Sequence, residues 1–369
     1  MLVVAELRGD GQMEKMGVEA QFEAGLGGVR REEPVPLLLD IGADIDGAFA
    51  LVYALLSPGI RLVGVTTSGG DLPARQAADN ALRLIRLCEP GYEVPVAAGE
   101  DGERELAAAG TAGGKSGGGP DGRSGSGAGD GEDNGRFGLG DALLAPSSQA
   151  PLPESAASFL ARAAAARPGE LTLALAGRAS NWPAALALEP ATAARFREAI
   201  AAGGTVLAPG DVSPMAESRF HGDPRAAAAL LETADRLTVV GLDAARRALL
   251  AGPDLALAAK LAREPRRRRA AELLRRLQAY RAGRLLATGF PLGAVPLHAT
   301  LGVLAAEDPS LFSFRTWRAR VESGPGLTSG TVVADRRDTP AAASGRAVRF
   351  AMDADGPRAV KRFLSVFVQ

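Results

Sequence analysis

Cysteine and histidine are almost absent from this sequence. Its 369 residues contain one cysteine, Cys88, and two histidines. A single cysteine excludes an intramolecular disulfide framework and a zinc site built from cysteines. Two histidines are too few for a metal centre that needs three of them. These kinds of stabilising and catalytic chemistry are therefore excluded by composition alone.

The sequence also lacks an excess of one charge and lacks long apolar runs. It has 42 Lys and Arg residues against 43 Asp and Glu residues, a formal net charge of -1. Near neutrality argues against bulk electrostatic binding to nucleic acid or to an anionic membrane. No apolar run is long enough to predict a membrane-spanning helix. Residues 1–34 have neither the apolar core of a signal peptide nor the acid-poor composition of a transit peptide. We therefore expect a cytoplasmic protein that binds neither nucleic acid nor membrane.

Glycine is abundant, and much of the excess is local. Of the 46 glycines, 15 lie within residues 101–140. Residues 101–133 are low in complexity and cannot supply a hydrophobic core, so we expect a flexible surface insert there. Residues 1–34 are expected to be a disordered extension. The remaining chain, residues 35–369, is long enough to bury a core and is predicted to form one α/β domain.

Short apolar runs alternate with helical patterns along this domain. Residues 35–42, 61–70 and 92–99 are predicted strands, and helices are predicted at 48–57 and 72–88. Strand–helix alternation with short connections predicts a doubly wound α/β sheet, mixed and mostly parallel. Ligands usually bind at the carboxyl ends of such strands, so the residues that follow each strand are the ones to inspect.

The second half of the domain continues the alternation. Residues 171–177 and 236–242 are predicted strands, residues 182–200 are predicted to be helical throughout, and a β-ribbon and a last helix end the chain. Residues 260–284 hold nine arginines and one lysine against two glutamates, a local charge of +8. Leucines recur on one side of this segment and no aromatic ladder accompanies the charges. The solvated face of an amphipathic helix is therefore favoured over a nucleic-acid site.

Three acids follow the first predicted strand. Asp40, Asp44 and Asp46 lie within seven residues, interleaved with Gly42 and Gly47. Such a cluster can bind a hard cation, because Ca²⁺ takes about six to eight oxygen ligands at close range. The alternative is structural: Asp46 caps the following helix and Asp44 is a turn residue. Taken by themselves, these residues leave both interpretations open.

Six strings, taken in order, resemble the inosine–uridine-preferring nucleoside hydrolases. The first, DIGADIDGA at 40–48, resembles a longer-loop variant of the family signature, in which a strand ends in Asp-Thr-Asp and a helix opens with Asp-Asp-Ala. The other five are GVTTSGGDLPARQAADNALRL, LTLALAGRASNWPAALAL, APGDVSPMAESRFHGDPRAA, VPLHATLGVLAAEDPSLF and RVESGPGLTSGTVVAD. The resemblance runs from Val35 to the C-terminus, interrupted by the glycine-rich insert. It implies a Rossmann-like, mixed and mostly parallel sheet flanked by helices.

The resemblance also implies a chemistry. In this family, water attacks the anomeric carbon of a ribonucleoside and breaks the N-glycosidic bond through an oxocarbenium-like transition state. A Ca²⁺ ion binds the ribose hydroxyls and the nucleophilic water, an aspartate ligand serves as base, and a histidine helps the leaving group depart. We therefore expect a nucleoside as small-molecule partner, Ca²⁺ as cofactor, a role in purine and pyrimidine nucleoside catabolism, and a homodimer or homotetramer.

The resemblance assigns the catalytic roles to Asp40 and His298. Asp40 matches an aspartate that is metal ligand and general base when the alignment is anchored on the strand, whereas anchoring on the helix would place Gly42 there. We prefer the strand anchor. His298 matches the catalytic histidine. The implied metal ligands are Asp40, Asp46, the backbone carbonyl of Ser180 and, as a substitute ligand, Asp44.

A second group of residues matches positions that bind the substrate. Glu217 matches the ribose-binding glutamate of the family. Asp71 and Asp211 stand where the family has asparagines that bind the sugar, and Arg219 replaces a third asparagine. Asn134 occupies the place of a histidine in a loop of the family.

Some matched positions depart from the family pattern. Gly47 and Ala299 stand where the family has metal-binding aspartates, so two of three carboxylate ligands would be missing. Arg219 introduces a positive charge where a metal and an oxocarbenium ion should be stabilised, which opposes the reaction electrostatically. An ion pair of Arg219 with Asp40 or Glu217 would fill the emptied site.

These departures leave three hypotheses. The first is a nucleoside hydrolase with an altered metal site. The second is a non-catalytic relative that binds a nucleoside or another ligand, or that serves as a scaffold. The third is an enzyme for a different glycosidic substrate that uses Asp44 and Asp71. Gly47 and Ala299 discriminate between the first two, because an enzyme should retain a set of ligands and a non-catalytic relative need not.

Overall fold

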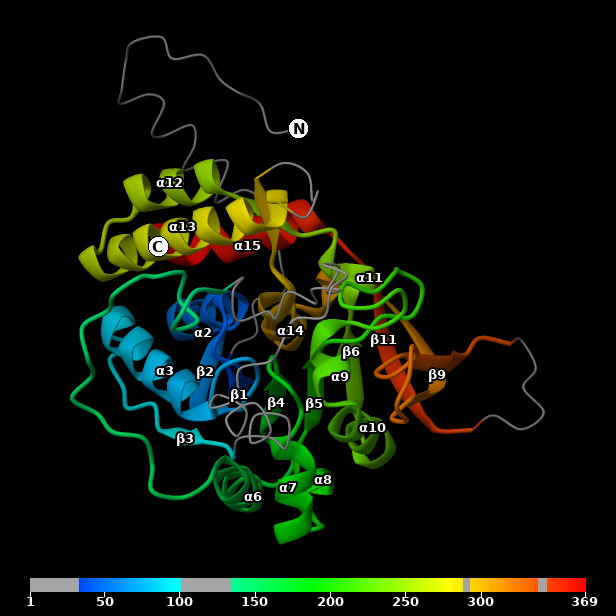
Figure 1. The fold of residues 1–369 in the computed structure, drawn as a ribbon. Coiled ribbons are helices and arrows are strands. Elements are labelled where there is room, and N and C mark those ends of the chain that lie inside the picture. The colour runs from blue at the N-terminus through cyan, green and yellow to red at the C-terminus, as the bar shows by residue number, and fades with distance from the viewer. Residues whose placement is uncertain (1–32, 101–133, 288–292, 338–343) are drawn as a thin grey trace, which may run out of the picture.

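The chain folds around a nine-stranded sheet (Figure 1). The computed structural model describes residues 33–100, 134–287, 293–337 and 344–369. Within these residues the strands lie in the order β10-β9-β11-β6-β5-β4-β1-β2-β3. Their bounds are β1 (Val35–Ile41), β2 (Ile60–Thr67), β3 (Val96–Ala98), β4 (Thr172–Leu175), β5 (Glu198–Ala202), β6 (Leu237–Val240), β9 (Phe312–Val321), β10 (Val332–Asp335) and β11 (Arg346–Ala354). A separate antiparallel pair joins β7 (Leu249–Ala251) to β8 (Ala294–Pro296).

Strand β1 lies inside the parallel part of the sheet. It pairs in parallel with β2 on one side and with β4 on the other. Strands β3, β5, β6 and β11 extend the parallel pairing, and β9 and β10 add an antiparallel edge. The predicted mixed, mostly parallel sheet is confirmed. The chain leaves β1 towards β2 and β3 and later returns to build β4, β5 and β6 on the opposite side. Strand β1 is therefore the topological switch point, where ligands bind in such sheets.

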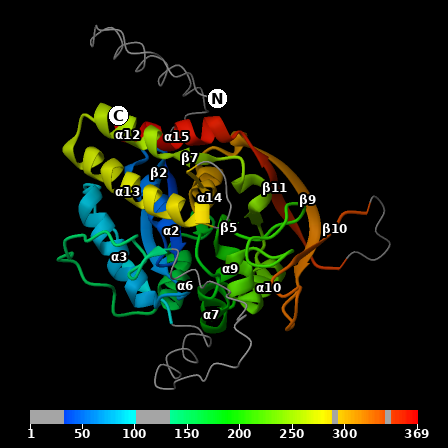
Figure 2. The same cartoon turned by 45° about the horizontal axis from the view of Figure 1, so that its top comes forward.

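Helices cover both faces of the sheet (Figure 2). They are α2 (Ile45–Leu56), α3 (Ala74–Cys88), α6 (Ala156–Ala166), α7 (Asn181–Leu188), α8 (Thr192–Arg195), α9 (Ser218–Gly222), α10 (Pro224–Thr233), α11 (Leu242–Ala245), α12 (Gly252–Leu261), α13 (Pro265–Ala287), α14 (His298–Glu307) and α15 (Gly356–Val368), with a 3-10 turn at Pro309–Leu311. One hydrophobic cluster joins the sheet to α2, α3, α13, α14 and α15, and another joins it to α6, α7 and α10. Alternate residues of β1 enter the two clusters, which explains why its sequence is a continuous apolar run.

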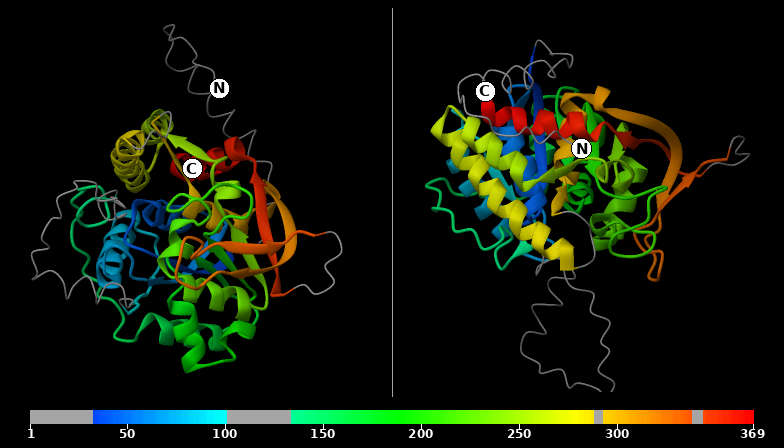
Figure 3. Two further views of the ribbon diagram at one scale, coloured as in Figure 1. Left: turned by 45° about the vertical axis from the view of Figure 1, so that its right-hand side comes forward. Right: turned by 90° about the horizontal axis from the view of Figure 1, so that it is seen from above.

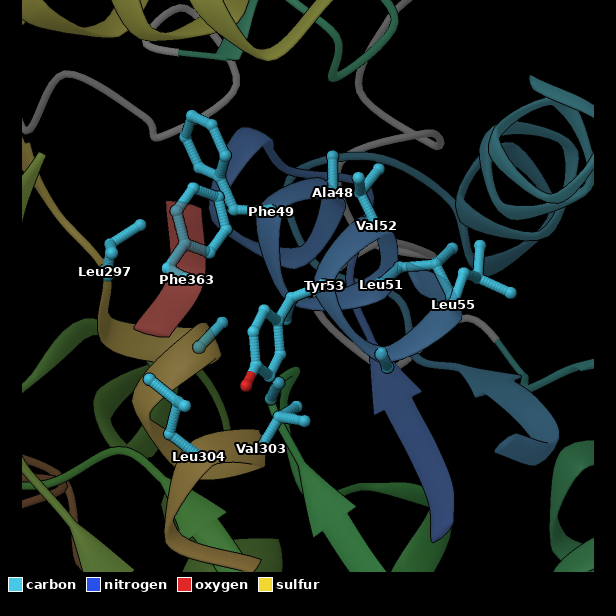
Figure 4. Packing of buried hydrophobic residues seen from close by; sticks show 14 of the residues in the cluster. Ala48, Phe49, Leu51, Val52, Tyr53, Leu55, Leu297, Val303, Leu304 and Phe363 are labelled. Atoms are coloured by element: carbon cyan, nitrogen blue, oxygen red, sulfur yellow. The ribbon is translucent and has the colours of Figure 1, made fainter. Parts of the chain in front are cut away.

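Helix α2 is buried on almost every side (Figure 4). Phe49 and Tyr53 each place their ring centroid 6.0 Å from that of Phe363 in α15. Val303 and Leu304 of α14 lie beside Tyr53 in the same cluster. Because α2 packs against both α14 and α15, the acidic loop at its N-terminus is held in a fixed position relative to the start of α14.

The arginine-rich segment forms α13, seen with α12 and α15 in Figure 3. Its buried side consists of small and aliphatic residues and packs against α12, α15, α2 and α3: Ala270, Ala271, Leu273, Leu274 and Leu277. Arginines occupy its exposed side: Arg268, Arg269, Arg275, Arg276 and Arg284. The predicted amphipathic helix is confirmed. No helix in the described residues has the length and apolar character needed to cross a membrane.

One secondary-structure prediction was wrong. Residues 182–200 are not helical throughout, because α7 and α8 are followed by strand β5 at Glu198–Ala202. Alanine favours helix intrinsically, but β5 fills the space between β4 and β6 and pairs with both. The hydrogen bonds and burial supplied by these neighbours outweigh a weak local preference. Residues 1–32 and 101–133, predicted as an extension and an insert, lie outside the described residues.

Candidate active site

The candidate active site lies at the carboxyl ends of the central strands. Asp40 is the penultimate residue of β1 and is in register with Thr66 of β2. Gly177 follows β4, and a Cβ atom there would lie 2.3 Å from Ser68 Oγ and 2.9 Å from the backbone nitrogen of Gly42. The loops after β1, β2 and β4 therefore approach one another as closely as a residue without a side chain allows.

Asp40 is fully buried. Its Oδ2 accepts hydrogen bonds from Thr66 Oγ1 at 2.7 Å and from Asn181 Nδ2 at 2.6 Å. Its Oδ1 is buried and has no hydrogen-bond partner among the described residues. Burial raises the pKa of Asp40 to about 7, although the hydrogen bonds from Asn181 and Thr66 lower it. A carboxyl group with this pKa and one unpartnered oxygen is suited to accept a proton near neutral pH.

Sequence reasoning missed two residues that hold Asp40 in place, Thr66 and Asn181. Asn181 Nδ2 also donates to the Thr67 carbonyl at 3.0 Å, so one amide ties the end of β1 to the end of β2. Ser180, expected to offer its carbonyl to a metal, directly precedes Asn181 at the N-cap of α7. The sequence feature that could have indicated Asn181 is an amide side chain directly after the turn that follows β4, in the string GRASN.

Asp44, and not Asp46, caps the helix that follows the acidic loop. Asp44 Oδ1 accepts a hydrogen bond from the backbone N–H of Gly47 at 2.5 Å, and burial raises the pKa of Asp44. Asn134 supports the same helix start, because its Oδ1 accepts from the backbone N–H of Ile45 at 3.1 Å. The interpretation of Asp46 as the cap was therefore wrong. Capping by Asp44 leaves the side chain of Asp46 available for contacts with other elements.

Arg219 joins four parts of the site. Its Nε donates to the carbonyl of Ala176 at 2.8 Å, directly after β4. Its Nη2 donates to Asp46 Oδ2 at 2.7 Å. Its Nη1 lies 3.4 Å from Glu217 Oε1 and 3.1 Å from His298 Nδ1. The guanidinium thus links the acidic loop, the end of β4, α9 and the start of α14.

The neighbouring carboxylates stabilise the charged form of Arg219. Burial by itself would lower the pKa of Arg219, but the carboxylates of Asp46, Glu217 and Asp44 raise it above its usual value. Of the two ion-pair partners predicted for Arg219, Glu217 is confirmed. The prediction of Asp40 was wrong, because Asp46 is the carboxylate within ion-pair distance, on the helix side of the loop.

His298 uses both ring nitrogens in this network. Its Nε2 lies 2.8 Å from the carbonyl of Val240, and its Nδ1 faces Arg219. A guanidinium can only donate and a carbonyl can only accept, so Nδ1 is the acceptor and Nε2 carries the proton. This pattern assigns a neutral histidine whose two nitrogens are both engaged. The predicted catalytic histidine therefore lies in the site, next to Arg219.

Glu217 and Asp211 lie together on the loop that leads into α9. Glu217 is fully buried, and its Oε2 accepts from the backbone N–H groups of Gly204 at 2.8 Å and Phe220 at 3.2 Å. Asp211 Oδ1 accepts from the backbone N–H of Ser218 at 2.8 Å. Burial, followed by the charge of Glu217, raises the pKa of Asp211. Two of the predicted substrate-binding acids are therefore neighbours.

Asp71 lies outside the network around Arg219. It forms an ion pair with Arg178 at 3.2 Å, and both side chains are partly exposed. Arg178 reaches the end of α9, since a Cβ atom on Gly222 would lie 2.4 Å from its Nε. Within the described residues, no hydrogen bond or ion pair connects Asp71 with Asp40.

The calcium site implied by the resemblance can be tested against these residues. Asp40 Oδ1 and Asp46 Oδ1 are buried carboxylate oxygens without a partner in the described residues, and both can accept a ligand. Gly47 and Ala299 offer no side-chain oxygen, and Asp46 Oδ2 already accepts from Arg219 and from the backbone N–H of Ala299 at 2.8 Å. No group of three or more His, Cys, Asp or Glu residues in the described ranges is arranged to hold a metal. Affinity for Ca²⁺ depends on the number of charged ligands, and with no acid at residues 47 and 299 and with Asp46 engaged by Arg219, these residues do not fit the ion.

Fold and site together define a class of protein. A mostly parallel α/β sheet with a buried proton-accepting carboxyl group at its switch point is typical of enzymes that act on small molecules. The family model described as inosine-uridine preferring nucleoside hydrolase matches residues 37–361, and the chain belongs to this family.

Relatives with similar sequences carry corresponding names. The chain is 28% identical over 308 residues to "Probable uridine nucleosidase 1" of Oryza sativa subsp. japonica, covering 81% of this chain and 85% of that protein. It is 29% identical over 324 residues to "Pyrimidine-specific ribonucleoside hydrolase RihA" of Shewanella sp. (strain ANA-3), covering 87% of this chain and 93% of that protein.

Solved structures share the fold. A plant nucleoside hydrolase, the PpNRh1 enzyme, superposes with a TM-score of 0.76 at 24% identity and covers 91% of this chain and 99% of its own. A purine-preferring ribonucleoside hydrolase from Gardnerella vaginalis gives a TM-score of 0.75 at 24% identity, with 90% and 98% coverage. At this identity, the two structures support the architecture and not the details of the site.

Proposed function

We propose that this protein hydrolyses the N-glycosidic bond of a ribonucleoside, with Asp40 as the general base. The observation that carries the proposal is the state of Asp40. It is buried at the switch point of the sheet, its Oδ2 is fixed by Thr66 and Asn181, and its Oδ1 has no partner among the described residues. Burial raises its pKa to about 7, so the carboxylate form can take a proton from water near neutral pH.

The reaction requires one bond to form and one to break. Asp40 accepts a proton from water as the water oxygen bonds to the anomeric carbon, and the carbon–nitrogen bond to the base breaks with oxocarbenium character. The leaving base takes the bonding electron pair and then a proton. Ribose and free base are the products.

The other acids are suited to binding the sugar. Glu217 and Asp211 are neighbouring carboxyl groups at the start of α9, and carboxylates accept hydrogen bonds from hydroxyl groups. His298 donates from Nε2 to a backbone carbonyl and accepts from Arg219 at Nδ1, so we assign it a positioning role for that guanidinium. Asp71 and Arg178 form a partly exposed pair outside this network.

The experiment that tests the proposal is a base-release assay on the full chain with uridine, cytidine, inosine and adenosine, repeated with Asp40→Asn. The asparagine keeps an oxygen to accept from Thr66 and Asn181 but cannot take a proton. We expect turnover by the parent protein and a loss of about 10²–10⁴-fold in the variant. Asp79→Asn is the matched control, because Asp79 forms a half-exposed surface pair with Arg83 and is expected to leave turnover unchanged.

Two results would contradict this function. Turnover that survives Asp40→Asn would exclude Asp40 as the base. No base release by the parent protein, together with nucleoside binding in equilibrium dialysis, would instead support the non-catalytic alternative. The names of the relatives make uridine the first substrate to test.

The remaining predictions belong to the same proposal. We infer a homodimer or homotetramer, which the family resemblance supports and which light scattering of the purified chain would test. We also infer a cytoplasmic location, which fractionation of the source cells would test.

A further inference from the structure

The guanidinium of Arg219 occupies the centre of the acidic part of the site. Its contacts reach Asp46 at 2.7 Å, Glu217 at 3.4 Å, His298 at 3.1 Å and the Ala176 carbonyl at 2.8 Å. These four contacts use four of its five N–H groups, so one N–H on Nη2 has no partner among the described residues and can donate to an oxygen of a ligand. Its side chain is only 13% exposed. It is therefore a fixed internal cation.

Arg219 also competes directly with a metal for Asp46. Oδ2 of Asp46 accepts from Nη2 of Arg219 and from the backbone N–H of Ala299, so a cation that coordinated this oxygen would have to displace both donors. A divalent ion near the guanidinium would be repelled by its positive charge, and burial makes such repulsion stronger than in water. Arg219 is therefore an electrostatic obstacle in addition to the missing oxygens.

The missing oxygens belong to the first turns of two helices. Gly47 is in the first turn of α2 and Ala299 is in the first turn of α14, and both turns contact the same Asp46–Arg219 pair. A Cβ atom at Gly47 would lie 3.2 Å from Asp44 Oδ1 and 3.3 Å from the Gly42 carbonyl oxygen, so a side chain there requires these neighbours to shift by a few tenths of an ångström.

We propose that the guanidinium of Arg219 replaces the divalent cation in this protein, so that the site is organised and binds its substrate without Ca²⁺. The proposal rests on the proposed function, because it concerns the same nucleoside site. In this arrangement Arg219 supplies the positive charge that balances Asp46 and Glu217, and its remaining N–H can donate to a hydroxyl group of the sugar. Asp40 keeps its unpartnered oxygen for water.

Calcium binding by the ligand-free full chain tests this proposal independently of turnover. After removal of metals with EDTA, we expect no binding tighter than about 10⁻⁴ M in calorimetry and no rise in melting temperature on addition of CaCl₂. Base release, where it is detected, should be unchanged by EDTA. Calcium binding by the parent protein tighter than this limit, or turnover that EDTA abolishes and Ca²⁺ restores, would overturn the proposal.

Two engineered variants separate the guanidinium from the missing oxygens. The triple variant Gly47→Asp, Ala299→Asp, Arg219→Asn is expected to gain a melting temperature that rises with CaCl₂. The matched double variant Gly47→Asp, Ala299→Asp, which keeps Arg219, is expected to show no such rise. Equal calcium-dependent stabilisation of both variants would show that Arg219 does not exclude the ion. If the triple variant does not fold, calorimetry on the parent protein still tests whether the natural site binds Ca²⁺. A parent protein without any turnover would refute the proposed function and leave this measurement intact.

Discussion

Helix α14 carries a buried cluster of charged residues at each end, and the two clusters differ in one respect. At its C-terminal end, Glu307 accepts from Ser57 Oγ at 2.8 Å, from Arg362 Nη2 at 2.6 Å and from the Tyr53 hydroxyl. Both oxygens of this carboxylate have partners. At its N-terminal end, Asp46 keeps one buried oxygen without a partner in the described residues, and so does Asp40 at the end of β1.

A buried polar atom without a partner costs free energy, so its presence calls for an explanation. We infer that the two ends of α14 serve different roles. The Glu307 cluster joins α2, α14 and α15, and both oxygens of its carboxylate are hydrogen-bonded, although Arg362 Nε is a buried donor without a partner in the described residues. Asp40 and the Asp46–Arg219 pair lie where parallel strands end, and both carboxylates keep an oxygen that can accept a hydrogen bond. The comparison indicates that unsatisfied carboxylate oxygens mark the ligand site, whereas saturated ones mark the frame that holds it.

The largest expected effect is at Asp40, which represents the ligand site in this comparison. Asp40→Asn should lower kcat/KM for the nucleoside by about 10²–10⁴-fold, while changing the free energy of unfolding by about 1 kcal/mol or less. The reason is that the amide preserves the contacts to Thr66 and Asn181 and removes only the proton acceptor. Steady-state kinetics and urea unfolding on the same preparations measure both quantities. A large loss of stability with unchanged kinetics would make Asp40 a structural residue instead.

The structural side of the comparison is tested at Glu307. Glu307→Gln should lower the free energy of unfolding by about 2–3 kcal/mol, because it leaves the partly buried Arg362 without its carboxylate. Turnover should be unaffected, since in the described part of the chain no hydrogen bond or ion pair joins this cluster to Asp40. Urea unfolding gives the stability. Glu264→Gln is the control, because the Glu264 side chain is 41% exposed, and we expect it to cost about 0.5 kcal/mol or less. Loss of turnover with unchanged stability would remove the distinction between the two ends of α14.

The pH profile sharpens the role of Asp40. Its pKa is raised to about 7 by burial, and only the deprotonated carboxylate can accept a proton from water. We therefore expect kcat/KM to fall about tenfold for each pH unit below 7 and to level off above it. Base release measured from pH 5 to pH 9 gives this profile. An inflection near the ordinary aspartate value of about 4 would show that Asp40 is not the titrating base.

The smallest effect concerns the helix cap inside the site. Asp44→Ala should cost about 1 kcal/mol of stability, similar to Asp223→Ala, because each aspartate caps a helix by accepting from a backbone N–H three residues later. Thermal unfolding of the two variants provides the comparison. Abolished turnover in Asp44→Ala alone would favour the hypothesis of a different glycosidic substrate that uses Asp44.

Much of the fold and part of the site could be predicted from sequence. The sequence predicted the strand that contains Asp40 and the amphipathic helix around Leu273. It also showed the resemblance of His298 and Glu217 to family positions. Strand β5 was missed because its alanines favour helix, and its strand conformation depends on β4 and β6. Asn181 was missed because its importance comes from a contact with Asp40, 141 residues away.

The sequence by itself determined the alternation of strands and helices, and it placed Asp40 near the end of the first strand. These features depend on periodicity and on contacts a few residues apart, which a string of residues displays. Only the tertiary structure decided which partner each acid has: Asp44 caps α2, Asp46 binds Arg219 173 residues away, and Asp40 keeps one oxygen without a partner among the described residues. Ion pairing and burial depend on distances in space, and the order of the strands in the sheet sets those distances.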